Sequence, residues 1–183
     1  MSDPVSALKG ASFEGFAKVR EIGPLGMITL RAKPGVKGLA AAVKAVTGTA
    51  LPKARRIEIK GDRAAGWMSP DEYLLILPYG ETGAAVVSLS KALEGQHHLV
   101  AVVSDARAVF RIEGEKADQV IRKLCPADMD KLEAGELRRT RAAQVAAAFW
   151  KDGEGYTLVC FRSVAGYMMG ILSHSAQKGA ELW

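Results

Sequence analysis

Apolar and polar residues follow the repeats of strands and helices over most of the chain. Residues 27–31 alternate apolar and polar side chains, as a strand does, and residues 38–47 carry apolar side chains at helical spacing before a glycine. Residues 56–60 alternate strictly and are expected to turn Ile57 and Ile59 toward one face. The first half is completed by expected strands over residues 64–68 and 73–77 and a helix over residues 82–93.

The second half of the chain shows the same kinds of pattern. Residues 115–124 carry one apolar stripe and predict an amphipathic helix that ends at Pro126. A polar connector follows, and it carries the basic residues Arg138, Arg139 and Arg141. The other elements expected here are strands over residues 99–104, 108–112, 144–150 and 156–161 and a final helix over residues 164–178. The mixture of strands and helices predicts an α+β fold.

Two stretches of the chain repeat one spacing of landmarks. Each has a Trp, a Tyr, an apolar strand and a helix closed by Gly: Trp67, Tyr73 and Gly95 in the first, Trp150, Tyr156 and Gly179 in the second. We predict an internal duplication of a strand-helix-strand-strand-helix unit, about residues 27–95 and 108–179, within a single domain over residues 21–183. Residues 1–20 are expected to form an N-terminal arm that can lie across a partner. The alternative is that any α+β chain yields two such strings, and superposing the halves decides between them.

The composition is that of a soluble globular protein. Apolar residues make up 49% and charged residues 25% of the 183, and the net charge of +5 is spread without a block of like charges. No stretch reaches the ~20 apolar residues of a spanning helix, and the N-terminus lacks a secretory pattern. We therefore expect no membrane contact and a cytoplasmic location. Cys125 and Cys160 lie in apolar segments and are expected to be small buried hydrophobes rather than nucleophiles.

Motifs that announce a catalytic or nucleotide site are absent from the sequence. None of GxGxxG, GxxxxGK(S/T) and GxSxG occurs. His97 and His98 are adjacent, so on an extended segment they point to opposite faces and do not suit one metal ion. The cluster of Arg138, Arg139 and Arg141 could bind phosphate, folate glutamates or nucleic acid, but no aromatic residue is interleaved with it. An exposed connector or a protein interface is the favoured interpretation.

Several segments in order resemble a known family. They are residues 67–77 (WMSPDEYLLIL), 104–114 (SDARAVFRIEG), 117–130 (ADQVIRKLCPADMD), 135–140 (GELRRT) and 160–176 (CFRSVAGYMMGILSHSA). From about residue 25 to the end, the sequence is similar to the gamma subunit of heterotetrameric sarcosine oxidase. It departs from that family at Met168 and Met169, where a Leu and a large aromatic residue are usual.

The resemblance implies a fold similar to the folate-binding domain of glycine-cleavage aminomethyltransferases, with two ferredoxin-like halves. It also implies an enzyme that oxidises sarcosine to glycine, passes the one-carbon unit to tetrahydrofolate or releases formaldehyde, and reduces oxygen to hydrogen peroxide. By the same resemblance, FAD, FMN, NAD and tetrahydrofolate belong to the alpha and beta subunits and zinc to the delta subunit. No cofactor, catalytic residue or metal ligand is expected in this chain.

The resulting hypothesis is a non-catalytic structural or assembly subunit whose partners are the alpha, beta and delta subunits. Candidate contacts are the N-terminal arm and the residues Tyr167, Met168, Met169, Arg138 and Arg139. For the methionines, packing in the chain's own core is the competing interpretation. A stand-alone folate-binding protein similar to aminomethyltransferases is the alternative function. A nucleic-acid-binding module rests only on the basic balance, and no nucleic-acid partner is expected.

Overall fold

The computed structural model describes residues 4–183, so the part of the predicted arm at residues 1–3 lies outside the described residues. The chain divides into two compact units. Unit 1 contains the residues up to Pro24 together with Asp105–Trp183, and unit 2 is the continuous stretch Leu25–Ser104. The chain therefore starts in unit 1, builds unit 2, and returns.

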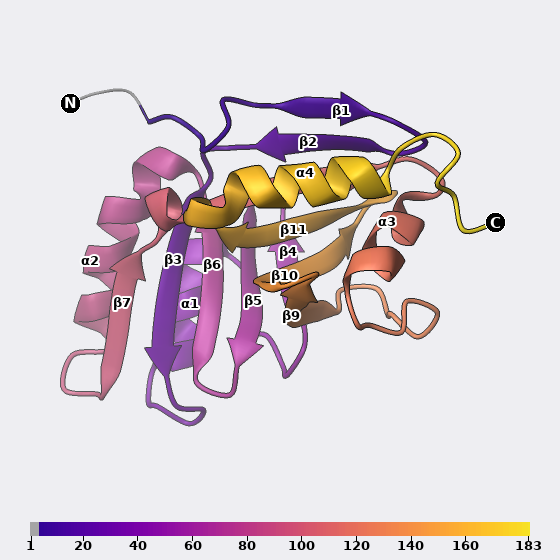
Figure 1. Ribbon diagram of the computed structural model, residues 1–183. Coiled ribbons are helices and arrows are strands. Elements are labelled where there is room, and N and C mark those ends of the chain that lie inside the picture. Colours follow the sequence, from indigo (N-terminus) through magenta and orange to yellow (C-terminus); the bar gives the residue numbers. More distant parts are fainter. Residues whose placement is uncertain (1–3) are drawn as a thin grey trace. The chain divides into compact units, whose positions relative to one another are not determined.

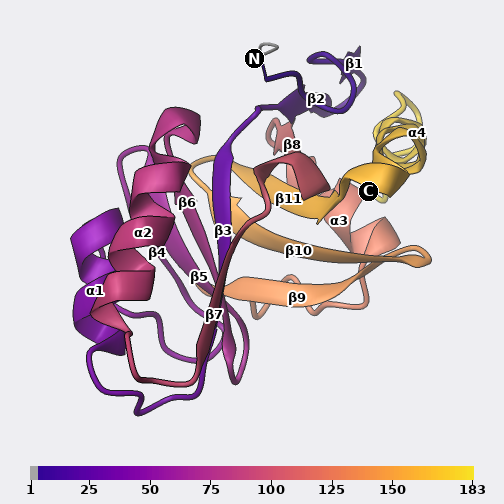
Figure 2. The ribbon, with the colours of Figure 1, turned by 90° about the vertical axis from the view of Figure 1, so that its left-hand side faces the viewer.

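Unit 2 is one antiparallel sheet with two helices on one face. Its elements are β3 (Gly26–Ala32), α1 (Leu39–Thr47), β4 (Ile57–Lys60), β5 (Arg63–Ser69), β6 (Glu72–Leu77), η1 (Tyr79–Glu81), α2 (Thr82–Ala92) and β7 (His98–Val102). The strands lie in the order β4-β5-β6-β3-β7, and Figure 2 shows α1 and α2 side by side along this sheet. Ile28, Leu75 and Leu89 are among the fully buried side chains between the helices and the sheet. Gly48 ends α1 in the left-handed conformation that favours glycine.

Unit 1 follows the same plan with a six-stranded sheet. Its elements are β1 (Ser12–Glu14), β2 (Lys18–Ile22), η2 (Ser104–Ala106, beginning at the unit boundary), β8 (Arg107–Glu113), α3 (Ala117–Leu124), β9 (Leu137–Ala142), β10 (Val145–Asp152), β11 (Gly155–Phe161), η3 (Arg162–Val164) and α4 (Ala165–Ser175). The strand order is β1-β2-β8-β11-β10-β9. α4 packs against β2 and β11, as Figure 1 shows. Phe110, Phe149 and Leu158 form the centre of the core beneath α3 and α4.

The expected α+β class is confirmed, and the strand order of the two units corresponds element by element. In unit 2 the order β4-β5-β6-β3-β7 matches β9-β10-β11-β8-β2 of unit 1. Three strands lie between the helices of each half; in the first half all three were expected, and in the second half β9 is added to the two expected strands. β2 and β7 hold the same place in their sheets but not in the chain, since β2 precedes β8 and β7 follows α2. The duplication therefore stays a prediction, which superposing residues 27–95 on 108–179 will test.

Three local predictions differ from the structure. The polar connector around Arg138 and Arg139 is the edge strand β9, whose charged side chains hide the usual apolar alternation. Residues 12–22, expected to belong largely to an arm, form β1 and β2, and β2 pairs with β8 inside the sheet. Ile59 is 47% exposed while Ile57 is buried, because β4 is an edge strand.

The Trp and Tyr landmarks match in spacing but not in register. Trp67 lies directly opposite Tyr73 across its hairpin, where the strand pairing is irregular between Trp67 and Ser69. Trp150 lies opposite Thr157 instead. A slip of one residue reverses the face to which a strand side chain points. Trp67 accordingly packs on the core beneath α1 and α2, whereas Trp150 is not part of the core beneath α3 and α4.

Candidate interaction surface

The outer face of α4 carries Tyr167, one of the exposed residues among the predicted contacts. Tyr167 is 46% exposed, and Gly166, Gly170 and His174 are exposed on the same helix. Residues three and four apart share a helix face, so these four form one stripe. We call this stripe the α4 outer face.

Met168 corrects one prediction, since it is a core residue and not a surface contact. Its side chain is fully buried in the cluster beneath α3 and α4. It points inward because it follows Tyr167 by one position on the helix, and successive residues face different directions. Met169 points neither fully outward, as Tyr167 does, nor fully inward, as Met168 does, and it is partly buried against the same core.

The glycines of α4 leave its outer face smooth. A Cβ built on Gly166 or Gly170 would meet no atom within 4 Å. The described residues therefore do not use the two glycines for close packing. The surface beside Tyr167 stays open to an approaching backbone.

Arg138 and Arg139 do not form one basic patch. Neighbouring residues on a strand point to opposite faces, and the register agrees, because Arg138 lies opposite Phe149 and Arg139 opposite Ala148. Arg138 is bound to the buried Glu136 at 3.0 Å. The predicted cluster is thus divided between the two sides of the sheet.

The N-terminal segment, residues 4–11, is tied to the sheet of unit 1. The carboxylate of Glu21, only 4% exposed, is the centre of this attachment. It accepts hydrogen bonds from the hydroxyl of Ser6 at 2.8 Å and from the backbone amides of Leu8 and Gly10 at 3.0 Å. The Arg162 guanidinium donates to two carbonyls of the same segment, at 3.0 and 3.3 Å. A buried carboxylate with three donors fixes the path of the segment.

The turn between β1 and β2 docks on the C-terminal end of α4. The amide of Phe16 donates to the carbonyl of Ala176 at 2.9 Å, and a Cβ on Gly15 would lie 1.8 Å from that oxygen. Only glycine allows this approach. The ammonium of Lys123 lies 4.8 Å from the centre of the Phe16 ring and donates to the carbonyl of Ala180 at 2.6 Å. One lysine thus joins the turn to the C-terminal tail.

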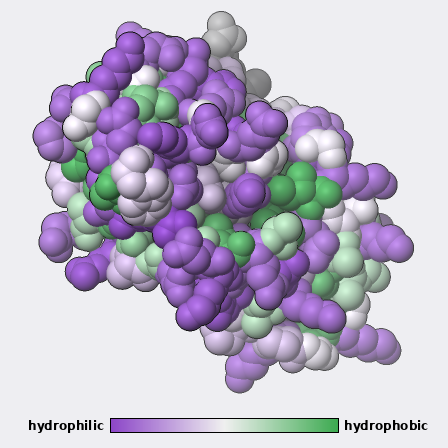
Figure 3. Space-filling model, turned by 90° about the vertical axis from the view of Figure 1, so that its right-hand side faces the viewer, coloured by the Kyte–Doolittle hydropathy of each residue, from purple (hydrophilic) through white to green (hydrophobic). Residues whose placement is uncertain are grey.

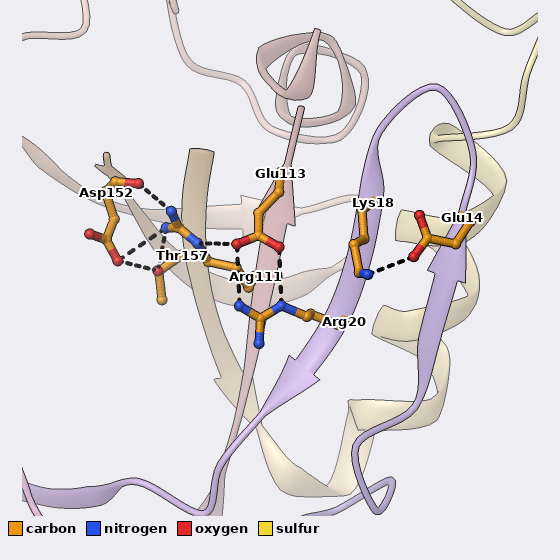
Figure 4. A network of polar contacts seen from close by, with 7 residues as sticks. All are labelled: Glu14, Lys18, Arg20, Arg111, Glu113, Asp152 and Thr157. Carbon is orange, nitrogen blue, oxygen red and sulfur yellow. Dashed lines mark hydrogen bonds and ion pairs between the residues drawn. The ribbon is translucent and has the colours of Figure 1, made fainter. Parts of the chain in front are cut away.

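A network of polar and charged side chains joins the strands β2, β8, β10 and β11 on the face that α3 and α4 leave uncovered (Figure 4). Glu113 accepts two hydrogen bonds from Arg20, at 3.1 and 3.2 Å, and pairs with Arg111 at 3.3 Å. Arg111 also bonds the side chains of Asp152 at 3.0 Å and Thr157 at 3.2 Å. The donors of these arginines are largely consumed within the chain, which indicates a structural role.

Neither this network nor the roles of Glu21 and Lys123 could be predicted from the sequence. The partner groups lie far apart in sequence, since Arg20 and Glu113 are 93 residues apart. The alternation in residues 18–22 gives one indication of the role of Glu21, because it places Glu21 on the same inward face as Val19.

The carboxyl groups with shifted pKa values do not have the properties of acid–base catalysts. The pKa values of Asp71, Glu113, Asp128 and Asp130 are all lowered, chiefly by hydrogen bonds that their carboxylates accept from neighbouring side chains. A general acid or base at neutral pH needs a pKa near 7, and these shifts run the other way.

Both cysteines are buried free thiols, as the sequence predicted. Burial raises the pKa of Cys125 to about 12 and that of Cys160 to about 11. Because the thiolate is the nucleophilic form, both thiols are protonated and unreactive at neutral pH.

Three surface hollows are lined by charged residues of both signs. They have volumes of about 450, 480 and 230 Å³, and in each an acid is paired with an arginine: Asp71 with Arg31, Glu81 with Arg63 and Asp118 with Arg122. His97 and His98 line the first, and no three His, Cys, Asp or Glu side chains of residues 4–183 are placed to hold a metal ion. None of the helices in these residues is long and apolar enough to span a membrane. The face seen in Figure 3 is mainly hydrophilic, with apolar residues in small groups.

The sequence is similar to a known protein family. The model of the "Sarcosine oxidase, gamma subunit family" matches residues 31–177. The sarcosine oxidase gamma subunit of Corynebacterium sp. strain U-96 is 36% identical over 156 residues, which are 81% of this chain and 74% of that protein. The gamma subunit from Arthrobacter sp. is 35% identical over 153 residues, 81% of this chain and 73% of that one.

Two solved structures have a similar fold. Heterotetrameric sarcosine oxidase from Corynebacterium sp. U-96, in complex with pyrrole 2-carboxylate, contains a chain with a TM-score of 0.79 and 27% identity, covering 90% of this chain and 87% of that one. The glycine cleavage system aminomethyltransferase T from Bartonella henselae gives a TM-score of 0.63 at 15% identity over 86% of this chain and 45% of that one. The expected aminomethyltransferase-like fold is confirmed.

Proposed function

The chain belongs to the sarcosine oxidase gamma subunit family, and on that basis we propose that it is a non-catalytic assembly subunit of a heterotetrameric sarcosine oxidase. The observation that carries this proposal is the family match over residues 31–177, together with a fold of the same kind as a chain of that enzyme. The substrate would be sarcosine, and the reaction its oxidation to glycine in the cytoplasm.

The chemistry of the reaction would lie in partner subunits. We place FAD, FMN, NAD, tetrahydrofolate and zinc there, with alpha, beta and delta chains as the partners. The properties of this chain's own groups support that division. Its shifted acids are more strongly ionised than usual, and its thiols are protonated. Neither kind of group is poised for proton transfer or nucleophilic attack at pH 7.

The α4 outer face is the proposed contact with a partner. Tyr167 offers a large exposed ring, and aromatic residues are enriched at the centres of protein interfaces. Gly166 and Gly170 allow a partner backbone to approach beside it. Met169 can contribute only its exposed part. On β9, Arg139 and Arg138 are proposed as separate contacts because they point to opposite sides of the sheet.

The alternative function, a stand-alone folate-binding protein, is favoured only by the fold likeness to aminomethyltransferase T. A pterin ring needs an acid that is free to accept its hydrogen bonds. Asp71, Glu81 and Asp118 in the hollows are each held by an arginine, and Asp62 lies beside Arg63. The remaining lining acids, Glu115 and Glu154, belong to the hollow of about 230 Å³, which is smaller than the ~300–1,000 Å³ of usual ligand pockets. These residues do not fit the pterin, so we derive no one-carbon step for this chain.

Purification of the tagged chain from its native host tests the proposal. The expected result is a complex with a flavin absorbance spectrum that produces hydrogen peroxide when sarcosine is added. Recovery of the chain without flavoprotein partners contradicts it. A titration of the purified chain with tetrahydrofolate separates the alternative, because tight binding by the chain alone would favour a folate protein.

A further inference from the structure

Strand β7 is an edge of the unit 2 sheet without the usual protection against pairing. Sheet edges are commonly guarded by charged side chains, proline or short length, because an open edge invites another strand. Of the other edges in residues 4–183, β4 carries Glu58 and Lys60, β9 carries three arginines, and β1 has three residues. β7 has the sequence HLVAV over five residues, with no Lys, Arg, Asp, Glu or Pro.

The outward backbone groups of β7 are unpaired. The amide of Val103 donates to the carbonyl of Met27 at 2.8 Å. In an antiparallel pair, every second residue of a strand directs its N–H and C=O groups toward the neighbouring strand, so this bond shows which residues of β7 face β3. Leu99 and Ala101 therefore bond toward β3, and Val100 and Val102 direct their N–H and C=O groups away from it. Within the described chain these outward groups have no hydrogen-bond partner.

Apolar side chains flank this edge on both faces of the sheet. Leu99 is 51% exposed and Val102 is 48% exposed. The two side chains lie on opposite faces because they are an odd number of positions apart. An added strand would cover both while pairing with the backbone between them.

One end of the edge is basic. The hollow of about 450 Å³ at the start of β7 is lined by Arg31, Lys33, His97 and His98. Its lining acid, Asp71, already accepts hydrogen bonds from Arg31 and Ser69. Neither Lys33 nor His97 has an ion-pair partner among residues 4–183. An occupant of this end is therefore complementary if it carries a carboxylate.

We propose that β7 accepts an extended apolar segment of a partner subunit as an additional strand, with an acidic side chain of that segment in the hollow beside Lys33 and His97. This inference rests on the proposed function, because it names what a partner of the complex contributes. The main-chain bonds would supply affinity, and the carboxylate would fix the register of the added strand.

Lysine substitutions at the edge test the side-chain part of the proposal in the native complex. Val102→Lys and Leu99→Lys introduce the charge that guards other edges, and Val87→Lys is the matched control, since Val87 is 68% exposed and lies on the helix α2 rather than on the edge strand. The edge variants should co-purify about tenfold less partner than wild type, and the control should match wild type. Lys33→Glu should weaken capture as well, and less so at high salt. All four should retain the wild-type circular dichroism spectrum.

Amide hydrogen exchange tests the backbone part. In the complex, exchange at Val100 and Val102 should be about a hundredfold slower than in the chain alone. Unchanged exchange, or edge variants that capture partner at the wild-type level, overturns the inference while leaving the proposed function intact. A homodimer of the isolated chain that Val102→Lys abolishes also overturns it, since a second copy would then cover the edge. If the wild-type chain captures no flavoprotein, the proposed function fails and this inference fails with it.

Discussion

Replacing Met168 by alanine should destabilise the chain strongly, whereas replacing its neighbour Tyr167 should not. Met168 is fully buried beneath α4, and the change removes three non-hydrogen atoms from the core. At about 0.8 kcal/mol for each buried methylene-sized group, the lost transfer free energy is about 2.4 kcal/mol. The cavity left behind adds to this, so we expect a free energy of unfolding about 3 kcal/mol lower.

Urea unfolding of the purified full chain, followed by circular dichroism, measures this difference. In a chain of this length about 3 kcal/mol corresponds to a fall in melting temperature of about 6–12 °C. Tyr167→Ala should stay within about 0.5 kcal/mol of wild type, because the ring is 46% exposed. Met168→Leu should recover most of the stability, since it conserves volume.

The opposite pattern would refute the assignment of faces on α4. If Met168→Ala unfolds like wild type but fails to assemble, Met168 is a surface contact, as the sequence alone suggested. If Tyr167→Ala is the destabilised variant, the ring belongs to the core. We expect Tyr167→Ala to capture less of the partner subunits while its free energy of unfolding stays close to that of wild type.

Other predictions follow from single contacts. Gly15→Ala should lower the free energy of unfolding by about 1–3 kcal/mol because its Cβ would overlap a carbonyl, while Gly166→Ala, in open space on α4, should raise it by up to about 1 kcal/mol in the same urea titration. Hydrogen bonding to arginine lowers the pKa of Glu113, so the network of Glu113 should stabilise the chain above about pH 4 and lose that contribution as the pH falls further. Urea unfolding between about pH 3 and pH 7 measures how the free energy of unfolding depends on pH, and Glu113→Gln should weaken that dependence. If Glu113→Gln has the same pH dependence as wild type, the ion pairs of Glu113 do not stabilise the chain. Cys125 and Cys160 should resist a thiol reagent at pH 7 in the native chain and both react after denaturation, and rapid native labelling would show that one is exposed.

Elements with a strong apolar period could be predicted from the sequence. β6 was recognisable because its residues 73–77 form one continuous buried run, and α1 because its stripe ends at Gly48. β9 could not be recognised from the sequence, because an edge strand needs few apolar residues and three arginines dominate its composition: Arg138, Arg139 and Arg141. β2 was missed because its inward positions hold only Val19 and the buried Glu21.

The candidate surface was predictable only in part. The sequence placed Tyr167 and Met168 together, and nothing local distinguishes which of two neighbouring apolar residues on a short helix faces the core. The basic cluster was predicted as one patch, but the strand conformation of β9 sends Arg138 and Arg139 to opposite sides. The open edge of β7 could not be identified at all, since which strands are edges depends on sheet order rather than on sequence.

Native mass spectrometry of the complex captured through this chain shows whether the chain is an assembly subunit of a larger enzyme. We expect a heteromeric assembly that contains this 19.5 kDa polypeptide, carries flavin on other subunits and oxidises sarcosine. Removing this chain should disperse the assembly, and the released chain should show no sarcosine-oxidising activity of its own. A free 19.5 kDa species without partners, or an assembly equally intact and active without it, would contradict the account.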